Sequence, residues 1–264
     1  MMNDDQQTIE FWENEYLKQI EHCLRIDYDK MMYGFATKEY IKDDWKPFLG
    51  KETSDFARGA ERIFYWLFNQ FGQPNSSPIG SDLFFETYNA YVHIDIKTVT
   101  LANIGDYTRN IFVGNNQVSY CALIEKQNGN NEMYIPNLPT IYTKKEENNN
   151  ITSKICLTYF ITILYDEVNL DIYNLSVICV PNGNLYSIYG NDVYSAGKNP
   201  GKARFSFSKC SEFKMLPSNP KRIKIIKHLD VLQSNYTKMT QETYSRKMEW
   251  WNQFHNESKH GKNL

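Results

Sequence analysis

Apolar and polar residues alternate strictly in the second half of residues 81–98. Three β-branched residues alternate with four others, Val92, Ile94 and Ile96 with Tyr91, His93, Asp95 and Lys97. A period of two is typical of a β-strand, whose successive side chains point to opposite faces of a sheet. We therefore predict a β-hairpin that has one apolar face in the core and one polar face that carries chemistry.

The turn of this hairpin decides which polar residues meet. A turn at residues 89–90 would place Lys97 opposite Asp82 and Phe84 opposite Asp95. Asp82 and Asp95 would then be diagonal neighbours on one face, with α-carbons roughly 7–8 Å apart. At this separation the two carboxylates can share one cation.

Two adjacent carboxylates repel, and each is pushed towards protonation unless a positive charge lies between them. Lys97 supplies one such charge, and a divalent cation would supply more. Mg²⁺ suits hard oxygen ligands and often binds through one or two carboxylates, waters and substrate phosphates. The chemistry that this pattern favours is metal-assisted hydrolysis of a phosphodiester.

Each of these residues also has a purely structural interpretation. Asp82 is equally able to cap a turn, and Asp95 with Lys97 can form an ion pair on a solvated strand. In the predicted register Glu86 lies opposite His93, which favours a polar pair that flanks the site over a ligand set.

Other periodicities predict the elements around the hairpin. Residues 54–68 predict an amphipathic helix capped by Ser54, and residues 7–35 predict another with apolar positions that include Phe11. Strands are predicted at 157–165 and 173–180, a turn at 128–129 and an exposed loop at 144–150.

These elements predict a mixed α/β fold with a central mixed β-sheet flanked by helices. We expect a single domain over 1–264, since 41% of the residues are hydrophobic and 15% are aromatic. Its predicted parts are a helical N-terminal region (1–50), a catalytic core (54–125), a basic segment (190–228) and a C-terminal helix (228–255). The N-terminal helix either forms a dimer interface or simply packs on the core.

The formal net charge of −2 hides an uneven distribution. Residues 197–228 hold nine basic side chains against Glu212 alone, whereas residues 1–60 hold thirteen acidic and eight basic ones. A concentrated positive segment is what a phosphate-contacting surface needs. We predict that Lys198, Lys202 and Arg204 contact DNA; the alternative is a solvated face.

Amide and guanidinium side chains follow the hairpin, and they are the groups that read base edges. The candidates for DNA binding are Asn103, Arg109, Asn115, Asn116 and Gln117. Because Asn is abundant throughout the chain, a polar surface loop is an equally good interpretation.

Several functions are disfavoured by what the sequence lacks. The five cysteines form no Cys-x-x-Cys pair and no zinc spacing with the five histidines. There is no phosphate-binding Gly-x-x-x-x-Gly-Lys-Ser/Thr motif, so we expect no nucleotide cofactor. No stretch approaches the roughly eighteen consecutive apolar residues of a membrane span, and no signal peptide is apparent. We therefore expect a cytoplasmic protein.

The hairpin residues resemble those of the PD-(D/E)xK nucleases. Asp82 is followed after thirteen residues by Asp95, within an Ile-Asp-Ile-Lys-Thr segment at 94–98. This pattern is most similar to type II restriction endonucleases of the EcoRV and HincII branch, which have a similar Asp-x-Lys-Thr. The usual Pro before the first Asp is Ser81 here, and the resemblance covers about residues 55–125.

The resemblance implies roles for individual residues. Asp82 and Asp95 would hold the metal together with the backbone carbonyl of Ile96. Lys97 would orient the attacking water and stabilise developing charge, because two carboxylates and a phosphate favour its protonated form. Glu61, on the helix before the first strand, would complete a second metal site or be an ordinary surface carboxylate.

The function implied is a Mg²⁺-dependent, sequence-specific double-stranded DNA endonuclease of a restriction-modification system. By resemblance it would be a homodimer that cuts a short palindrome and leaves 5′-phosphate ends. Two alternatives stay open at this point. One is a DNA repair or junction-resolving nuclease of the same superfamily, and the other is a non-catalytic DNA-binding protein that retains the fold.

Overall fold

The computed structural model describes residues 4–35, 56–69, 72, 81–103, 110–119, 121–125, 129–146, 149–166, 171–183, 194–196, 202–206, 215 and 220–228. Its helices are α1 (Asp4–Ile26) and α3 (Phe56–Phe68), with a 3₁₀ turn η2 (Leu101–Asn103) and a further helical segment at 28–35. The strands, in chain order, are β1 (Leu83–Glu86), β2 (Ala90–Thr100), β3 (Asn110–Gly114), β4 (Ala122–Glu125), β5 (Asn131–Tyr134), β6 (Ile141–Lys145), β7 (Ile151–Tyr165), β8 (Ile172–Val180), β9 (Tyr194–Ala196), β10 (Lys202–Ser206) and β11 (Ile223–His228).

A mixed β-sheet forms the centre of the described structure, as predicted. Its strand order is β1-β2-β7-β8-β11, and β6 pairs with the first part of β7. β2 and β7 are parallel over eleven residues, and the other described pairs are antiparallel. All nine residues of β8 are buried, including the polar Asn174 and Ser176 among its otherwise largely apolar side chains.

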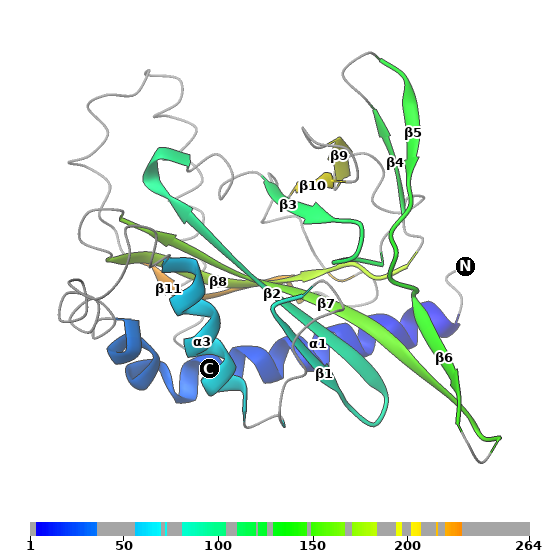
Figure 1. Ribbon diagram of the computed structural model, residues 1–264, viewed down its shortest axis with the longest axis horizontal. Coiled ribbons are helices and arrows are strands. Elements are labelled where there is room, and N and C mark those ends of the chain that lie inside the picture. Colours follow the sequence, from blue (N-terminus) through cyan, green and yellow to red (C-terminus); the bar gives the residue numbers. More distant parts are fainter. Residues whose placement is uncertain are drawn as a thin grey trace, which may run out of the picture.

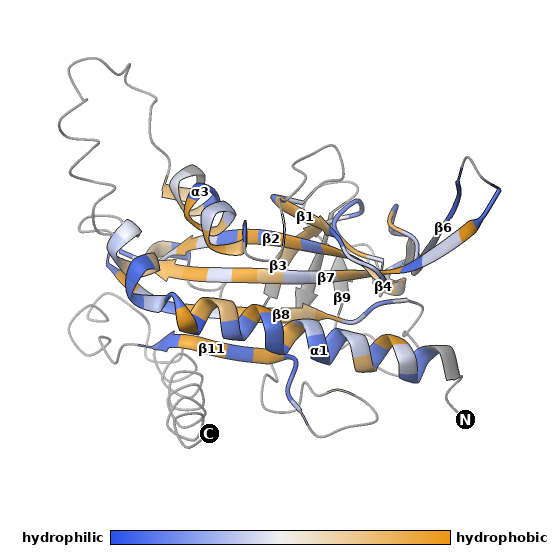
Figure 2. Cartoon of the chain, turned by 90° about the horizontal axis from the view of Figure 1, so that it is seen from below, coloured by the Kyte–Doolittle hydropathy of each residue, from blue (hydrophilic) through white to orange (hydrophobic). Residues whose placement is uncertain are grey.

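The sheet has a different layer on each face (Figures 1 and 2). Helices α1 and α3 cover one face, and the small sheets β3-β10-β9 and β4-β5 lie on the other. The predicted apolar face of β2 is confirmed, because Val92, Ile94 and Ile96 are buried in one core cluster with Leu17 of α1 and Phe64 of α3. The opposite face, which carries Asp95, therefore faces the small sheets.

A buried charge cluster joins α1 to the strand edge at β11. The guanidinium of Arg222 is fully buried and lies 2.9 Å from Glu13 and 3.4 Å from Glu10. A backbone N–H of Asn182 also donates to Glu13, at 2.7 Å. Arg222 belongs to the basic run that we interpreted as a DNA surface, so that interpretation is wrong for this residue. Its charge is used to neutralise acidic groups of α1 inside the protein.

Some sequence expectations differ from the structure in detail. Phe11 is 55% exposed, because α1 turns only one face to the sheet. The predicted exposed loop at 144–150 begins inside β6, which is exposed along its whole length. Asn128 of the predicted turn at 128–129 lies outside the described residues, whereas β4 and β5 pair antiparallel and Gly129 between them has a positive φ (77°). The predicted helix 228–255 lies outside the described residues, apart from its first residue, which ends β11.

Within the described residues, the structure has no helix with a sufficiently long apolar stretch to span a bilayer.

Arg222→Ala should lower the free energy of unfolding by about 3–5 kcal/mol, since it leaves two buried carboxylates without a cation. Urea denaturation at pH 7.5 measures the loss. The matched control is Lys18→Ala, which removes an exposed i,i+3 ion pair with Glu15 and should cost less than about 1 kcal/mol. Equal effects of the two substitutions would show that the cluster does not stabilise the fold.

Candidate active site

The β1–β2 hairpin brings the two predicted aspartates together in a register that differs from the expected one. The ladder pairs Leu83 with Ile94 and Glu86 with Tyr91, so the turn is at Tyr88-Asn89 and not at 89–90. The predicted pairs Lys97 with Asp82, Phe84 with Asp95 and Glu86 with His93 are therefore wrong. The shift is two residues, which keeps every side chain on its predicted face.

Hydrogen bonds around Thr87 fix this turn. Its backbone N–H donates to the carbonyl of Ala90 at 2.8 Å, and its hydroxyl accepts from the N–H of Ala90 at 3.0 Å. The hydroxyl of Tyr16 on α1 lies 2.7 Å from both Thr87 Oγ1 and Asn89 Oδ1. The helix therefore adds a tertiary contact to a turn that local hydrogen bonds also stabilise.

In the observed register the aspartates come directly after the last pair of the ladder. Asp82 precedes Leu83 and Asp95 follows Ile94, and these two residues are paired. Asp82 Oδ2 accepts a hydrogen bond from the backbone N–H of Ile96 at 2.6 Å. Lys97 forms an ion pair with Asp95. The structure thus brings together Asp82, Asp95, Ile96 and Lys97, the four residues predicted for the core of the site.

The carboxylate of Asp95 is only 3% exposed and has partners from two parts of the chain. Lys97 contacts Oδ2, and the side-chain amide of Gln117 donates to Oδ1 at 2.8 Å. Burial raises the pKa of Asp95 to about 6; Lys97 opposes this shift, whereas the charges of Asp82 and Glu61 add to it. Glu61, which lies on α3, makes the smallest of these contributions to the pKa of Asp95.

The middle of the polar face of β2 is buried, whereas Tyr91 and Lys97 towards its ends are partly exposed. His93 is 1% exposed, and neither ring nitrogen has a hydrogen-bond partner among the described residues. Its ring meets Phe84 edge-to-face at 4.9 Å. Burial lowers the pKa of His93 to about 4. Glu86, its predicted partner, instead accepts a hydrogen bond from Lys154 of β7 at 2.7 Å.

The predicted DNA-contacting residues separate into several groups. Asn103 ends η2 and is exposed, and Asn115 and Asn116 lie in the turn after β3. Gln117 of the same turn is directed to Asp95 instead of to solvent. Arg109 and Lys198 lie outside the described residues.

The remaining two, Lys202 and Arg204, belong to β10. The backbone of β10 pairs with β3, with Lys202 opposite Gly114 and Arg204 opposite Phe112. The turn after β3 reaches Asp95 through Gln117, so this small sheet is joined to the face of the main sheet that bears the aspartates. Sequence reasoning assigned Gln117 to base contacts, and no local signal indicated its contact with Asp95.

The donor set fits a magnesium ion. The described residues contain no group of three or more His, Cys, Asp and Glu side chains arranged for a metal. Mg²⁺ does not need such a group, because it commonly binds through one or two carboxylates and keeps several waters. Each carboxylate oxygen has two lone pairs, so the hydrogen bonds to Asp82 and Asp95 leave capacity for a cation.

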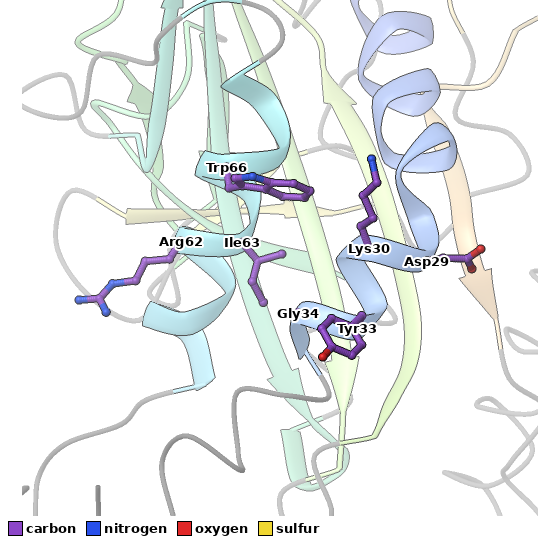
Figure 3. Close-up of a pocket in the computed structure, with 7 residues that line it drawn as sticks. All are labelled: Asp29, Lys30, Tyr33, Gly34, Arg62, Ile63 and Trp66. Carbon is purple, nitrogen blue, oxygen red and sulfur yellow. The ribbon is translucent and has the colours of Figure 1, made fainter. Parts of the chain in front are cut away.

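A separate pocket of about 680 Å³ lies in the helical layer (Figure 3). In Figure 3, Ile63 and Trp66 of α3 face the segment that bears Tyr33 and Gly34, whereas Arg62 extends outward. The described residues that line this pocket do not include Asp82, Asp95 or Lys97. We therefore place the candidate active site at the aspartates.

Two solved structures have a similar fold. One is the tetrameric restriction endonuclease SfiI bound to cognate DNA, which is 14% identical in sequence. The superposition has a TM-score of 0.66 and covers 88% of this chain and 90% of the SfiI chain. The restriction endonuclease BglI bound to its DNA recognition sequence is 16% identical, covers 84% of this chain and 90% of its own, and gives 0.54. The fold is therefore that of the restriction endonucleases.

Family models define the protein more closely. The model of the N-terminal domain of the type II restriction enzyme MwoI matches residues 5–169, and that of its central domain matches 172–227. The chain belongs to this family and is a type II site-specific deoxyribonuclease. The narrower likeness to the EcoRV and HincII branch stays a prediction, because the comparisons name MwoI, SfiI and BglI. A sequence search of curated proteins gives no match.

His93 gives the fold a pH dependence whose sign is set by its lowered pKa of about 4. The unfolded chain binds a proton near pH 6.5 and the folded chain does not, so stability falls as the pH drops from about 6.5 to about 4. Between pH 7.5 and 5.5 the wild type should lose about 1–1.5 kcal/mol more than His93→Phe, as measured by urea denaturation. A difference independent of pH would contradict this assignment.

Proposed function

We propose that this chain is a Mg²⁺-dependent, sequence-specific endonuclease that hydrolyses both strands of double-stranded DNA to 5′-phosphate ends. The observation that carries the proposal is the juxtaposition of Asp82, Asp95 and Lys97 at the end of the β1–β2 ladder. Membership of the MwoI family supports the reaction, because type II restriction enzymes cut DNA at defined sites.

Asp82, Asp95 and the backbone carbonyl of Ile96 would hold the magnesium ion. When bound, this ion supplies Lewis-acid stabilisation of the phosphate and lowers the pKa of a coordinated water. The N–H of Ile96 donates a hydrogen bond to Asp82 at 2.6 Å. The backbone of Ile96 and the carboxylate of Asp82 therefore lie side by side in one hairpin. Glu61 is the candidate for a second cation, because its charge acts on Asp95.

Lys97 has the role of a cation beside the attacking water and not of a general base. Its ammonium is ion-paired with Asp95 and lies 5.4 Å from the centre of the Phe160 ring. With 26% of its side chain exposed, the ammonium can still meet substrate. Its role is to orient the attacking water and to stabilise negative charge on the phosphoryl group in the transition state.

The small sheet would carry the DNA contacts. β10 contributes Lys202 and Arg204, and its partner β3 leads into the turn that contacts Asp95. A duplex bound to this sheet would therefore lie on the catalytic side of the main sheet. SfiI and BglI are complexes with DNA, which supports double-stranded DNA as the substrate class.

Cutting both strands calls for two active sites, and the proposed hairpin provides one per chain. A homodimer with twofold symmetry would match two equivalent half-sites of the DNA. The SfiI structure is described as tetrameric, and a tetramer also contains the paired sites that double-strand cleavage needs.

Asp95→Ala should abolish cleavage while DNA binding is preserved or strengthened, because it removes a carboxylate that would face phosphate. Digests of phage DNA of known sequence with Mg²⁺ measure cleavage, and gel shifts in Ca²⁺ measure binding. The matched control is Asp29→Ala on the helical segment 28–35, where the side chain is exposed. Cleavage by Asp95→Ala would refute the site, and binding without nicking by the wild type under varied divalent metals would refute the enzyme.

Lys202→Ala and Arg204→Ala should each weaken DNA binding and reduce the slope of log K against log salt by about one, as expected for loss of one phosphate contact. The slope is measured by fluorescence anisotropy between about 50 and 200 mM salt. Lys18→Ala on α1, in the layer on the other face of the sheet, is the control. An unchanged slope in both β10 variants would show that this strand does not contact the DNA backbone.

A further inference from the structure

Gln117 is placed by a tight turn at the end of β3. Its backbone N–H donates to the carbonyl of Gly114 at 3.0 Å, and its side-chain Oε1 accepts from the N–H of Gly114 at 2.8 Å. A Cβ at Gly114 would lie 2.9 Å from Asn116 Oδ1, so the turn closes around a glycine. These bonds use the oxygen of the Gln117 amide inside the turn and leave its NH₂ group to point outward.

Hydrogen bonds and burial hold the turn after β3 in place on both sides of Gln117. The carbonyl of Asn115 accepts from the N–H of Asn137 at 2.5 Å. Further along, Val118 and Ser119 are buried, and the Ser119 hydroxyl donates to the side chain of Asn182. Gln117 therefore projects from an anchored backbone, which limits the positions that its amide can reach.

The outward NH₂ group meets the metal-binding carboxylate. Gln117 Nε2 lies 2.8 Å from Asp95 Oδ1, while Lys97 contacts Oδ2. A hydrogen bond at one oxygen and an ion pair at the other restrict the rotation of the carboxylate about its last bond. The hydrogen bond from Gln117 also occupies one lone pair of Oδ1 and so limits the directions from which a cation can be bound there.

We propose that Gln117 is a positioning residue that orients the Asp95 carboxylate for metal binding, and not a residue that reads DNA bases. This inference rests on the proposed function, since it assigns Gln117 to the same site. Outer hydrogen-bond partners of metal ligands typically contribute 10- to 100-fold to metal affinity or activity. Gln117 joins Asp95 to a turn that continues β3, so a segment of the small sheet completes the catalytic site.

The test uses Gln117→Met, which retains the length of the side chain and removes its donor. We expect kcat on cleavable DNA to fall about 10- to 100-fold and the Mg²⁺ concentration for half-maximal rate to rise. The Kd for DNA in Ca²⁺ should stay within about threefold of the wild type, because no base contact is lost. Gln19→Met, on an exposed position of α1, is the matched control and should leave all three quantities unchanged.

Other outcomes separate the alternatives. Wild-type kcat in Gln117→Met would overturn the proposal, as would a weakened Kd with unchanged kcat, which marks a base or phosphate contact. Gln117→Glu guards against a purely structural effect of methionine: it places a second carboxylate beside Asp95 and should also lower kcat while thermal unfolding confirms a folded protein. If Asp95→Ala still cuts DNA, the proposed site itself fails, whatever Gln117→Met does.

Discussion

The parallel pairing of β2 with β7 is the constraint on which the other features of this protein depend. It holds β2 in register over eleven residues, from Ala90 to Thr100, and places it between β1 and β7. A strand at this position has both faces covered, here by helices on one side and by small sheets on the other. Asp95 and Lys97 are therefore held on a rigid backbone, and their surroundings are set by whatever packs above them.

This arrangement explains the unusual electrostatics of the site. Asp95 is buried beside Lys97 and within reach of the charges of Asp82 and Glu61, and its pKa is raised to about 6. The same sheet buries a second charge cluster next to its helical face, where Arg222 neutralises Glu10 and Glu13. That cluster has its cation built into the protein and joins α1 to β11. At Asp95 acidic charge is in excess, which favours binding of a further cation from outside.

The helical face of the sheet thus has a structural role, and the opposite face carries the candidate site. The basic residues near the C-terminal end of the described chain are likewise found on both sides. Arg222 and Lys224 lie at β11 and pair with acidic groups of α1, with Lys224 3.7 Å from Glu21. Lys202 and Arg204 lie on β10, in the small sheet beside the aspartates. Basic residues that are close in the sequence therefore form two separate groups in the structure. The reason is that β10 belongs to the small sheet and β11 to the main sheet.

The sequence by itself determined the β1–β2 hairpin, the strands β7 and β8, the helix before them and the residues proposed for the site. Alternation of Val92, Ile94 and Ile96 with polar residues is a local property, and the structure preserves it, so Asp82, Asp95 and Lys97 were identifiable from their spacing. The amphipathic period of 54–68 likewise predicted α3, the helix that carries Glu61.

Only the tertiary structure decided the hairpin register, the burial of His93 and the partner of Asp95. Tyr16 donates a hydrogen bond to the hairpin turn from seventy-one residues away, and Gln117 reaches Asp95 across twenty-two residues. Arg222 finds its acidic partners more than two hundred residues earlier in the chain. Periodicity reports which face a side chain takes, whereas the group that it meets there depends on the packing of distant elements.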